Sequence, residues 1–319
     1  MRVLVVTNMY PTETMPAFGV FVYEQVQSLR RRGAQVDVLF INGKESTWNY
    51  LRGFAQVRRQ VRAARYDIVH AHYVFSGVMA RAQFRRPLVV SFHGAGEMFG
   101  WVGWLCRALA PWVDAFTVTS AEHEAELGAK GAHIIPCGID TELFQPMPRA
   151  EARQRLGLPL DKKLILFAAD LRPEKRVDVA RAAVALLQRE TPEVELLVVT
   201  GRPHSDIPLF MNACDALVLT SDAEGSPQVV KEAMACNLPI VSVEVGDVAE
   251  VIGGTAGCFL CQRTPEDVAA KLRLALERGR RTNGREAVLH LSLDRIADRI
   301  LGIYGQVLVR RGEPREGQP

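Results

Sequence analysis

The chain has 319 residues, which is enough for about two domains of ordinary size. Its 39 lysines and arginines against 36 acidic residues leave a formal charge of +3, too small an excess to indicate a nucleic-acid-binding protein. No apolar run is long enough to cross a bilayer, and residues 1–7 predict a short strand rather than a signal peptide.

Six cysteines are scattered through apolar stretches of the chain. This scatter, in a chain of this length, indicates reduced thiols and a cytoplasmic protein. Cys258 and Cys261 have the spacing of a redox or metal-binding pair, but no second pair accompanies them and their surroundings are apolar. We interpret them as packed side chains, with a redox role as the alternative.

The first half of the chain alternates between apolar strand segments and amphipathic helix segments, as in a parallel sheet covered by helices. The pattern predicts strands at 2–7, 35–40, 67–72 and 115–120, a further strand that begins at residue 87, and helices at 20–32, 50–66 and 98–113. No Gly-x-Gly-x-x-Gly pattern follows the first strand, which argues against an ordinary dinucleotide site.

Three histidines lie in or after these strands. His70 and His72 are two residues apart on one strand and so share a face. They could bind a metal ion, but no acidic or cysteine partner is near in sequence, and we predict that His72 faces the cleft while His70 is structural. His93 follows a buried strand and is therefore expected at the carboxyl edge of the sheet; the alternative is a structural histidine.

The segment 98–113 contains three of the four tryptophans, Trp101, Trp104 and Trp112, on roughly one helical face. Core packing is the expected arrangement. The alternative is an interfacial surface for a lipid-linked acceptor, because the region from Lys44 to Arg107 carries ten basic residues against three acidic ones.

The second half continues the alternation. It predicts strands at 164–169, 194–200, 216–220 and 239–243, and helices at 149–156, 265–280 and 293–310. The first of these strands is followed by a charged loop that contains Arg172 and Lys175. Positive charge at a helix start opposes the helix dipole and so favours an anionic partner; the alternative is a solvated cluster.

The strand at 216–220 leads into the sequence from Glu224 to Glu232. Ser226 is a good N-cap and Pro227 fits the first helical position. Asn237 is a suitable residue after the helix end, because it tolerates the left-handed conformation. The segment therefore predicts a strand, a loop, a helix and a second strand of a parallel sheet.

Two carboxylates of this segment carry the chemistry. Glu224 is expected in the loop at the carboxyl end of the strand, where open α/β sheets bind ligands. Glu232 follows Gln228 and Val229 by four and three residues, so it shares a face with the amides that open the helix. Those amides suit a phosphate and the carboxylate suits a vicinal diol, which together describe a nucleoside diphosphate.

The Glu-x7-Glu spacing after a buried strand, continued as Glu-Ala-Met-Ala-Cys-Asn-Leu-Pro-Ile-Val, resembles the donor site of retaining GT-B glycosyltransferases of the group 1 or family 4 type. The pair alone is a weak signal, since any amphipathic helix can expose two glutamates at this spacing. The resemblance covers nearly the whole chain, with its specific motifs between residues 164 and 252. It implies an α/β fold with two Rossmann-like domains whose parallel sheets face a cleft.

The resemblance also implies roles for individual residues. Glu224 would contact the transferred sugar and Glu232 the ribose. His93, in a His-Gly motif, would lie beside the sugar, and a loop glycine would let the backbone approach the donor phosphate. The remaining donor-binding positions are Gly19, Arg172, Lys175, Gly225, Ser226, Pro227, Gln228 and Val229.

The sequence departs from the family pattern at several positions. Asp170 stands where the family has the arginine that clamps the diphosphate, so we assign that role to Arg172, while Lys175 matches the family lysine. Gly96 stands where the family often has an acid, and Glu97 follows it. Only some ten residues separate Gly201 from the next motif, which indicates that a helix and strand that help to hold the base are missing.

We therefore expect an acceptor-side domain at 1–146, on which a helix at about 296–310 packs back, and a donor-binding domain at 147–295. The expected activity is metal-independent, retaining transfer of a hexosyl or hexosaminyl group from a UDP- or GDP-sugar to a sugar or lipid-linked hydroxyl, without a cofactor. Peripheral contact with the inner face of a membrane is a further expectation. A nucleotide-sugar epimerase and a non-catalytic sugar-nucleotide-binding protein are the alternatives.

Overall fold

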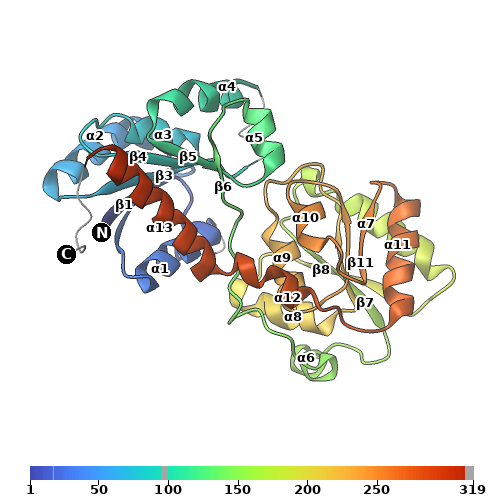
Figure 1. Cartoon of the computed structure of the whole chain (residues 1–319). Helices are drawn as coiled ribbons and strands as arrows, with labels where there is room; N and C mark the ends of the chain where they lie inside the picture. Colours follow the sequence, from blue (N-terminus) through green and yellow to red (C-terminus); the bar gives the residue numbers. More distant parts are fainter. Residues whose placement is uncertain (17, 95–99, 313–319) are drawn as a thin grey trace. The chain divides into compact units, whose positions relative to one another are not determined.

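The computed structural model describes residues 1–16, 18–94 and 100–312. Its contacts divide the chain into two compact units. Unit 1 comprises residues 1–138 and 293–319, and unit 2 comprises residues 139–292. Each unit is built on one parallel sheet, as the alternating sequence pattern predicts (Figure 1).

The division between the units falls at residue 138, eight residues before the expected boundary at 146. Hydrogen bonds explain the difference. The N–H of Ile139 donates to the carbonyl of Leu291, and the guanidinium of Arg285 donates to the carbonyls of Thr141 and Phe144. These bonds attach the segment 139–146 to unit 2.

Unit 1 has a six-stranded sheet in the order β2-β1-β3-β4-β5-β6. Its strands are β1 (Arg2–Thr7), β2 (Gln35–Phe40), β3 (Ile68–His72), β4 (Leu88–Ser91), β5 (Ala115–Val118) and β6 (His133–Ile134). Its helices are α1 (Val20–Arg31), α2 (Trp48–Ala63), α3 (Val74–Ala80), α4 (Gly100–Leu109) with the 3₁₀ helix η2 (Ala110–Trp112), α5 (Ala121–Leu127) and α13 (Leu293–Arg310). The tail from Arg311, which the sequence predicts to be disordered, lies outside the described residues from position 313 onward.

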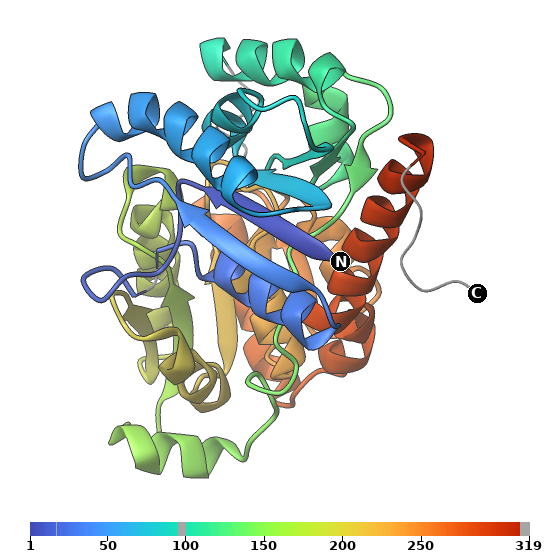
Figure 2. The ribbon, with the colours of Figure 1, turned by 90° about the vertical axis from the view of Figure 1, so that its left-hand side faces the viewer.

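Two helical layers cover this sheet. Helices α1 and α13 lie on one face, and α2, α3 and α4 lie on the other (Figures 1 and 2). Two ion pairs join α13 to the end of α1: Arg31 with Asp294 at 3.1 Å and Arg32 with Asp298 at 2.6 Å.

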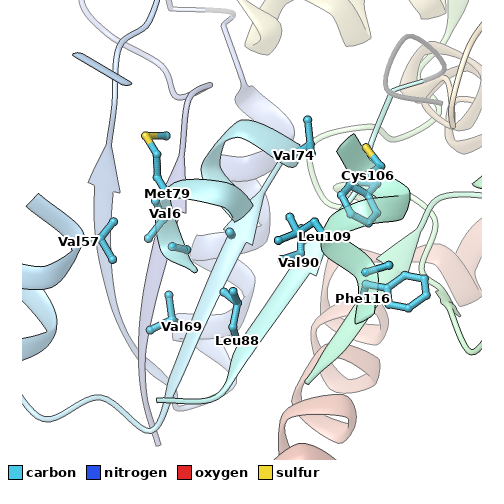
Figure 3. Close-up of a cluster of buried hydrophobic side chains, with 14 of the residues drawn as sticks. Val6, Val57, Val69, Val74, Met79, Leu88, Val90, Cys106, Leu109 and Phe116 are labelled. Carbon is cyan, nitrogen blue, oxygen red and sulfur yellow. The ribbon is translucent and has the colours of Figure 1, made fainter. Parts of the chain in front are cut away.

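The core beneath α2, α3 and α4 is filled by apolar side chains from both the helices and the strands (Figure 3). The helices contribute Val57, Met79, Cys106 and Leu109, and the strands contribute residues such as Val90. Each helix thus buries one stripe of residues and leaves its opposite face outward, as expected of a helix on a sheet.

Unit 2 has a five-stranded sheet in the order β11-β10-β9-β7-β8. Its strands are β7 (Lys163–Ala168), β8 (Val194–Val199), β9 (Ala216–Leu219), β10 (Ile240–Val243) and β11 (Cys258–Cys261). Its α-helices are α6 (Arg149–Leu156), α7 (Val177–Gln188), α8 (Ile207–Ala213), α9 (Gln228–Ala235), α10 (Val248–Ile252), α11 (Pro265–Arg278) and α12 (Gly284–Val288). Short 3₁₀ helices are η3 (Pro173–Lys175), η4 (His204–Asp206) and η5 (Leu289–Leu291).

The end of α9 follows the prediction and its start does not. Asn237 has a positive φ of 56°, and the N–H groups of Asn237 and Leu238 donate to the carbonyls of Met234 and Ala233, which terminates the helix. The N-cap is Pro227, without a side-chain hydrogen bond, and the helix begins at Gln228.

Candidate functional site

The carboxyl edge of the unit 2 sheet brings together the two charged loops singled out in the sequence. Lys175 follows β7 and Glu224 follows β9, and these strands are neighbours in the sheet. The Nζ atom of Lys175 lies 2.6 Å from Oε1 of Glu224, and the two side chains are only 16% and 13% exposed. Sequence positions 49 residues apart therefore form one half-buried ion pair.

Glu232 lies on α9 and is buried. Its Oε1 atom lies 2.8 Å from Nε2 of His204, which precedes α8. No motif in the sequence had pointed to His204. The signal that could have found it is its place in the short connection after β8, at the sheet edge that holds the other site residues.

The loop between Glu224 and α9 is held by a buried charged cluster. The Oγ atom of Ser226 donates to Asp247 at 2.6 Å, and Nζ of Lys231 donates both to Asp247, at 2.7 Å, and to Ser226. Lys231 is fully buried and Asp247 nearly so. The prediction that Ser226 caps α9 is thus wrong, because its side chain bonds to Asp247 instead.

Backbone proximity fixes the same loop. Gly246 has a φ of 56°, and a side chain there would collide with the carbonyl oxygens of Glu224 and Gly225. Gln228 and Val229 open α9, so their N–H groups lie at the helix end whose donors lack intrahelical acceptors. An anion is stabilised at such an end.

Arg172 lies in the same loop as Lys175 but on its surface. Its guanidinium pairs with Glu174 at 2.8 Å, and the side chain is 60% exposed. Arg176, which adopts a left-handed conformation with φ of 51°, pairs with Asp178 and Asp222. Asp170 is exposed at the end of β7.

In unit 1, the three histidines gather where β3 and β4 end. His72 pairs with Ser91 in the sheet register, and Nδ1 of His72 lies 2.8 Å from Nε2 of His93. His70 lies 2.6 Å from the hydroxyl of Tyr304 and 2.8 Å from Oγ of Ser91. His70 and His72 are fully buried, so the shared face predicted from their spacing lies inside the unit. The prediction that His72 faces a cleft is therefore wrong, whereas His70 is structural, as predicted.

Burial dominates the acid–base behaviour of these groups. It lowers the pKa of His70 to about 3, and it lowers the pKa of His72 well below its usual range with help from the neighbouring imidazoles. His93 is partly exposed, and desolvation by its neighbours also lowers its pKa. All three imidazoles are therefore neutral near pH 7.

Gly19 occupies a position that only glycine fits. It precedes α1 with a φ of 72°, and a Cβ atom there would collide with the backbone of Met9 and Tyr10. The departures noted at Gly96 and Glu97 lie outside the described residues.

The tryptophans do not fill the core, so the core-packing prediction is wrong. Trp101, Trp104 and Trp112 are 67%, 64% and 67% exposed. The inward stripe of α4 consists of smaller residues instead, Gly103, Cys106 and Leu109. A helix on a sheet buries only one stripe of residues. In α4 the stripe of smaller residues packs against the sheet, so the tryptophan face points outward.

Several other features bear on the chemistry. No group of three or more His, Cys, Asp and Glu side chains suited to a metal ion occurs among the described residues. Within those residues no helix is long and apolar enough to cross a membrane. Burial raises the pKa of Cys258 to about 11 and of Cys261 to about 12, which agrees with packed thiols rather than reactive ones.

Both units match known glycosyltransferase families. The model of Glycosyltransferase Family 4 matches residues 18–143, and that of Glycosyl transferases group 1 matches residues 162–278. The two matches together span most of the chain, and the two parallel sheets agree with the GT-B fold. The chain therefore belongs to the GT-B glycosyltransferases of these families and is an enzyme of that class.

Curated relatives are distant but extensive. TuaC of Bacillus subtilis, named for teichuronic acid biosynthesis, is 25% identical over 79% of this chain and 83% of its own length. A D-inositol 3-phosphate glycosyltransferase of Acidothermus cellulolyticus is 28% identical over 77% of this chain and 68% of its own length. Nothing in these similarities supports the epimerase alternative.

Solved structures share the fold. Sucrose-phosphate synthase from Thermosynechococcus elongatus is similar with a TM-score of 0.80 at 20% identity, over 97% of this chain and 100% of that one. Anabaena HepE, solved in complex with UDP and glucose, is similar with a TM-score of 0.69 at 19% identity, over 98% and 100% of the two chains.

Proposed function

We propose that the chain is a retaining, metal-independent glycosyltransferase that moves a hexosyl or hexosaminyl group from a nucleotide sugar to a hydroxyl acceptor in glycan or glycolipid assembly. The observation that carries the proposal is the cluster at the carboxyl edge of the unit 2 sheet, where Lys175 pairs with Glu224 and where Glu232 lies on the following helix, α9. A lysine can neutralise a diphosphate, and two carboxylates can accept hydrogen bonds from the hydroxyl groups of a sugar and a ribose.

In this proposal, Lys175 and Glu224 neutralise each other until the donor arrives. Lys175 would then face the diphosphate, whose negative charge grows as the bond to the sugar breaks. Glu224 would face the sugar, on which positive charge develops. Because both interactions strengthen toward the transition state, both lower the barrier rather than merely tightening binding.

His93 suits the role that the resemblance implies for it. Its neutral imidazole, expected from the lowered pKa, can exchange a hydrogen bond with a sugar hydroxyl. A charged imidazolium would instead oppose the positive charge developing on the sugar. The roles of Gly19 and Arg172 at the donor phosphates stay predictions.

The donor is the first property to test. UDP is the nucleotide present in the HepE structure, which makes UDP-sugars the first candidates and GDP-sugars the second. Thermal-shift titration against a panel of both types should raise the melting temperature with one base over the other. Slow hydrolysis of the stabilising donor, followed by NMR, then tests retention through the anomer that is released first.

Metal independence follows from the proposed role of Lys175. A lysine in contact with the diphosphate replaces the divalent cation that other transferases use, so a chelator should leave turnover nearly intact. A strict requirement for Mg²⁺ or Mn²⁺ would contradict this part of the proposal.

We also propose that unit 1 contacts an anionic membrane surface from the cytoplasmic side, where a lipid-linked acceptor would be found. The support is the tryptophan surface, defined by Trp48, Trp101, Trp104 and Trp112, which lies in the helical layer α2 to α4 and is exposed. Helix α2 carries four arginines and no acidic residue, and all four are exposed. Amphipathic aromatic side chains beside positive charge favour anionic interfaces.

Vesicle co-sedimentation at low salt tests this contact. The double variant Trp101→Ala with Trp104→Ala should reduce binding to phosphatidylglycerol vesicles by roughly tenfold or more. Leu160→Ala, which removes an equally exposed apolar side chain in unit 2, is the matched control and should change nothing. Equal losses in both, or no binding by the unmodified protein, would contradict the proposal.

A further inference from the structure

His204 has a contact that neither the sequence pattern nor the proposed roles include. Its Nε2 atom lies 2.8 Å from Oε1 of Glu232, the carboxylate proposed to hold the ribose. The two residues are 28 positions apart and come from different connections of the unit 2 sheet. The contact therefore depends on the fold and not on local helix geometry.

The imidazole of His204 packs against a buried aromatic ring. The ring of Phe144 lies 5.2 Å from it, centroid to centroid, and Phe144 is fully buried. The carbonyl of Phe144 in turn accepts a hydrogen bond of 2.6 Å from Arg285. A side chain held between a fixed aromatic wall and a carboxylate has few alternative orientations.

The pair is also open on one side. The His204 side chain is 23% exposed, whereas that of Glu232 is 7% exposed. His204 follows β8, the neighbour of β7, at the same sheet edge as Lys175 and Glu224. A ligand at that edge would thus meet His204 and the rim of the Glu232 carboxylate together.

The chemistry of a carboxylate makes this arrangement informative. Each carboxylate has two acceptor oxygens, and the bond to His204 uses Oε1. Fixing one oxygen also fixes the plane and the direction of the other, Oε2. Preorganisation of this kind improves binding because less side-chain freedom is lost when the ligand arrives.

We propose that His204 is a positioning residue for nucleoside binding: it holds one oxygen of the Glu232 carboxylate so that the other meets the ribose hydroxyls of the donor. The inference rests on the proposed function, because it assumes that Glu232 holds a ribose. His204 would thus give the short 201–206 connection a part in nucleoside binding, although the helix and strand that help to hold the base in the family are expected to be missing here.

The readout is the preference for ribose over deoxyribose, which a purely structural role would not change. Calorimetry compares UDP with dUDP and GDP with dGDP. The unmodified protein should bind the ribonucleotide of its preferred base roughly 10- to 100-fold more tightly, the range expected for hydrogen bonds to a charged group.

Three substitutions of His204 separate the possibilities. His204→Leu fills the space beside Phe144 but offers no hydrogen-bond donor. The ratio of ribonucleotide to deoxyribonucleotide affinity should then fall to about threefold or less, because the charge-assisted hydrogen bond to Glu232 is lost. His204→Gln can place an amide nitrogen near the Nε2 position and should keep most of the preference. His204→Asn is too short to do so and should lose it.

Two controls complete the experiment. His290→Gln changes an exposed histidine of the same unit and should leave binding unchanged. Combining His204→Leu with Glu232→Ala should cost no more preference than Glu232→Ala alone, because both act through one carboxylate. The Gln and Asn variants keep the test decisive if the Leu variant does not fold.

The possible failures are distinguishable. If no nucleoside diphosphate binds the unmodified protein, the proposed function fails. If the protein binds the nucleotide without preferring ribose, the role of Glu232 fails, and the role of His204 fails with it. If the preference exists and folded His204→Leu and His204→Asn both retain it, the inference about His204 alone is overturned.

Discussion

The two units differ in the polar contacts that they bury most deeply. Unit 1 encloses neutral groups, among them the imidazoles of His70 and His72 and the hydroxyl of Tyr304. Unit 2 encloses charged pairs, including Lys231 with Asp247 and the salt bridge of Arg153 to Asp215. Lys231 and Asp247 hold the loop between Glu224 and α9 at the carboxyl edge of the unit 2 sheet, whereas Arg153 and Asp215 hold the opposite end, where β9 begins.

This difference determines what should damage each unit. A buried ion pair costs much desolvation, so removing one partner leaves an uncompensated charge. A buried neutral histidine is damaged by protonation instead. All four tryptophans lie in unit 1, so tryptophan fluorescence reports unfolding of that unit, while circular dichroism reports both.

The largest expected effect comes from breaking the buried pair in unit 2. Lys231→Met should lower the free energy of unfolding of that unit by roughly 3–5 kcal/mol, because Asp247 is left buried and unpaired. Chemical denaturation should show the loss by circular dichroism but not by tryptophan fluorescence.

A double variant serves as the control for this prediction. Lys231→Met with Asp247→Leu removes both charges and should recover most of the stability. If the double variant is as unstable as the single one, the loss arises from packing and not from the unpaired charge.

The two site glutamates should fail differently. Glu232→Ala should raise the donor KM and cost roughly 2–4 kcal/mol in kcat/KM, because its contact with the unreactive ribose is similar before and during reaction. Glu224→Gln should lower kcat with much less effect on diphosphate binding. Calorimetry with the nucleoside diphosphate product decides: equal weakening by both substitutions would contradict this division of roles.

Acid should weaken unit 1. The pKa values of His70 and His72 are lowered in the folded state. Below the ordinary histidine pKa of about 6.5, these two side chains therefore bind protons more readily in the unfolded chain than in the folded one. Stability is therefore full above about pH 6.5 and falls below it. Lowering the pH from 7.5 to 5.5 should cost roughly 3 kcal/mol for His70 and His72 together, and the lowered pKa of His93 adds to the loss.

Tryptophan-monitored denaturation at the two pH values measures this loss. The part of the unfolding transition that circular dichroism alone detects should shift less, because His70 and His72 both lie in unit 1. An equal loss in both units would show that the histidines are not its source.

The smallest expected effect belongs to Arg172. Its side chain is mostly exposed and paired with Glu174, and exposed pairs contribute roughly 0–1 kcal/mol. Arg172→Ala should therefore weaken diphosphate binding by less than about tenfold, and Lys175→Ala by more. If calorimetry gives the reverse order, Arg172 is the main phosphate ligand despite its exposure.

The strands and the two-part α/β organisation could be predicted from the sequence, because apolar runs and helical periodicity are local properties. The same holds for the end of α9 at Asn237 and for the placing of Lys175 and Glu224 at one edge, which follows once parallel strands are recognised.

Other features needed the tertiary structure. Periodicity showed that the tryptophans share a face, but their exposure depends on which stripe of α4 meets the sheet. Ser226 is of a residue type that favours the N-cap, yet its hydroxyl donates a hydrogen bond to Asp247, 21 residues later. The contact of His204 with Glu232 likewise joins two sheet connections, because side-chain partners across a fold are set by strand order and packing, which no local pattern contains.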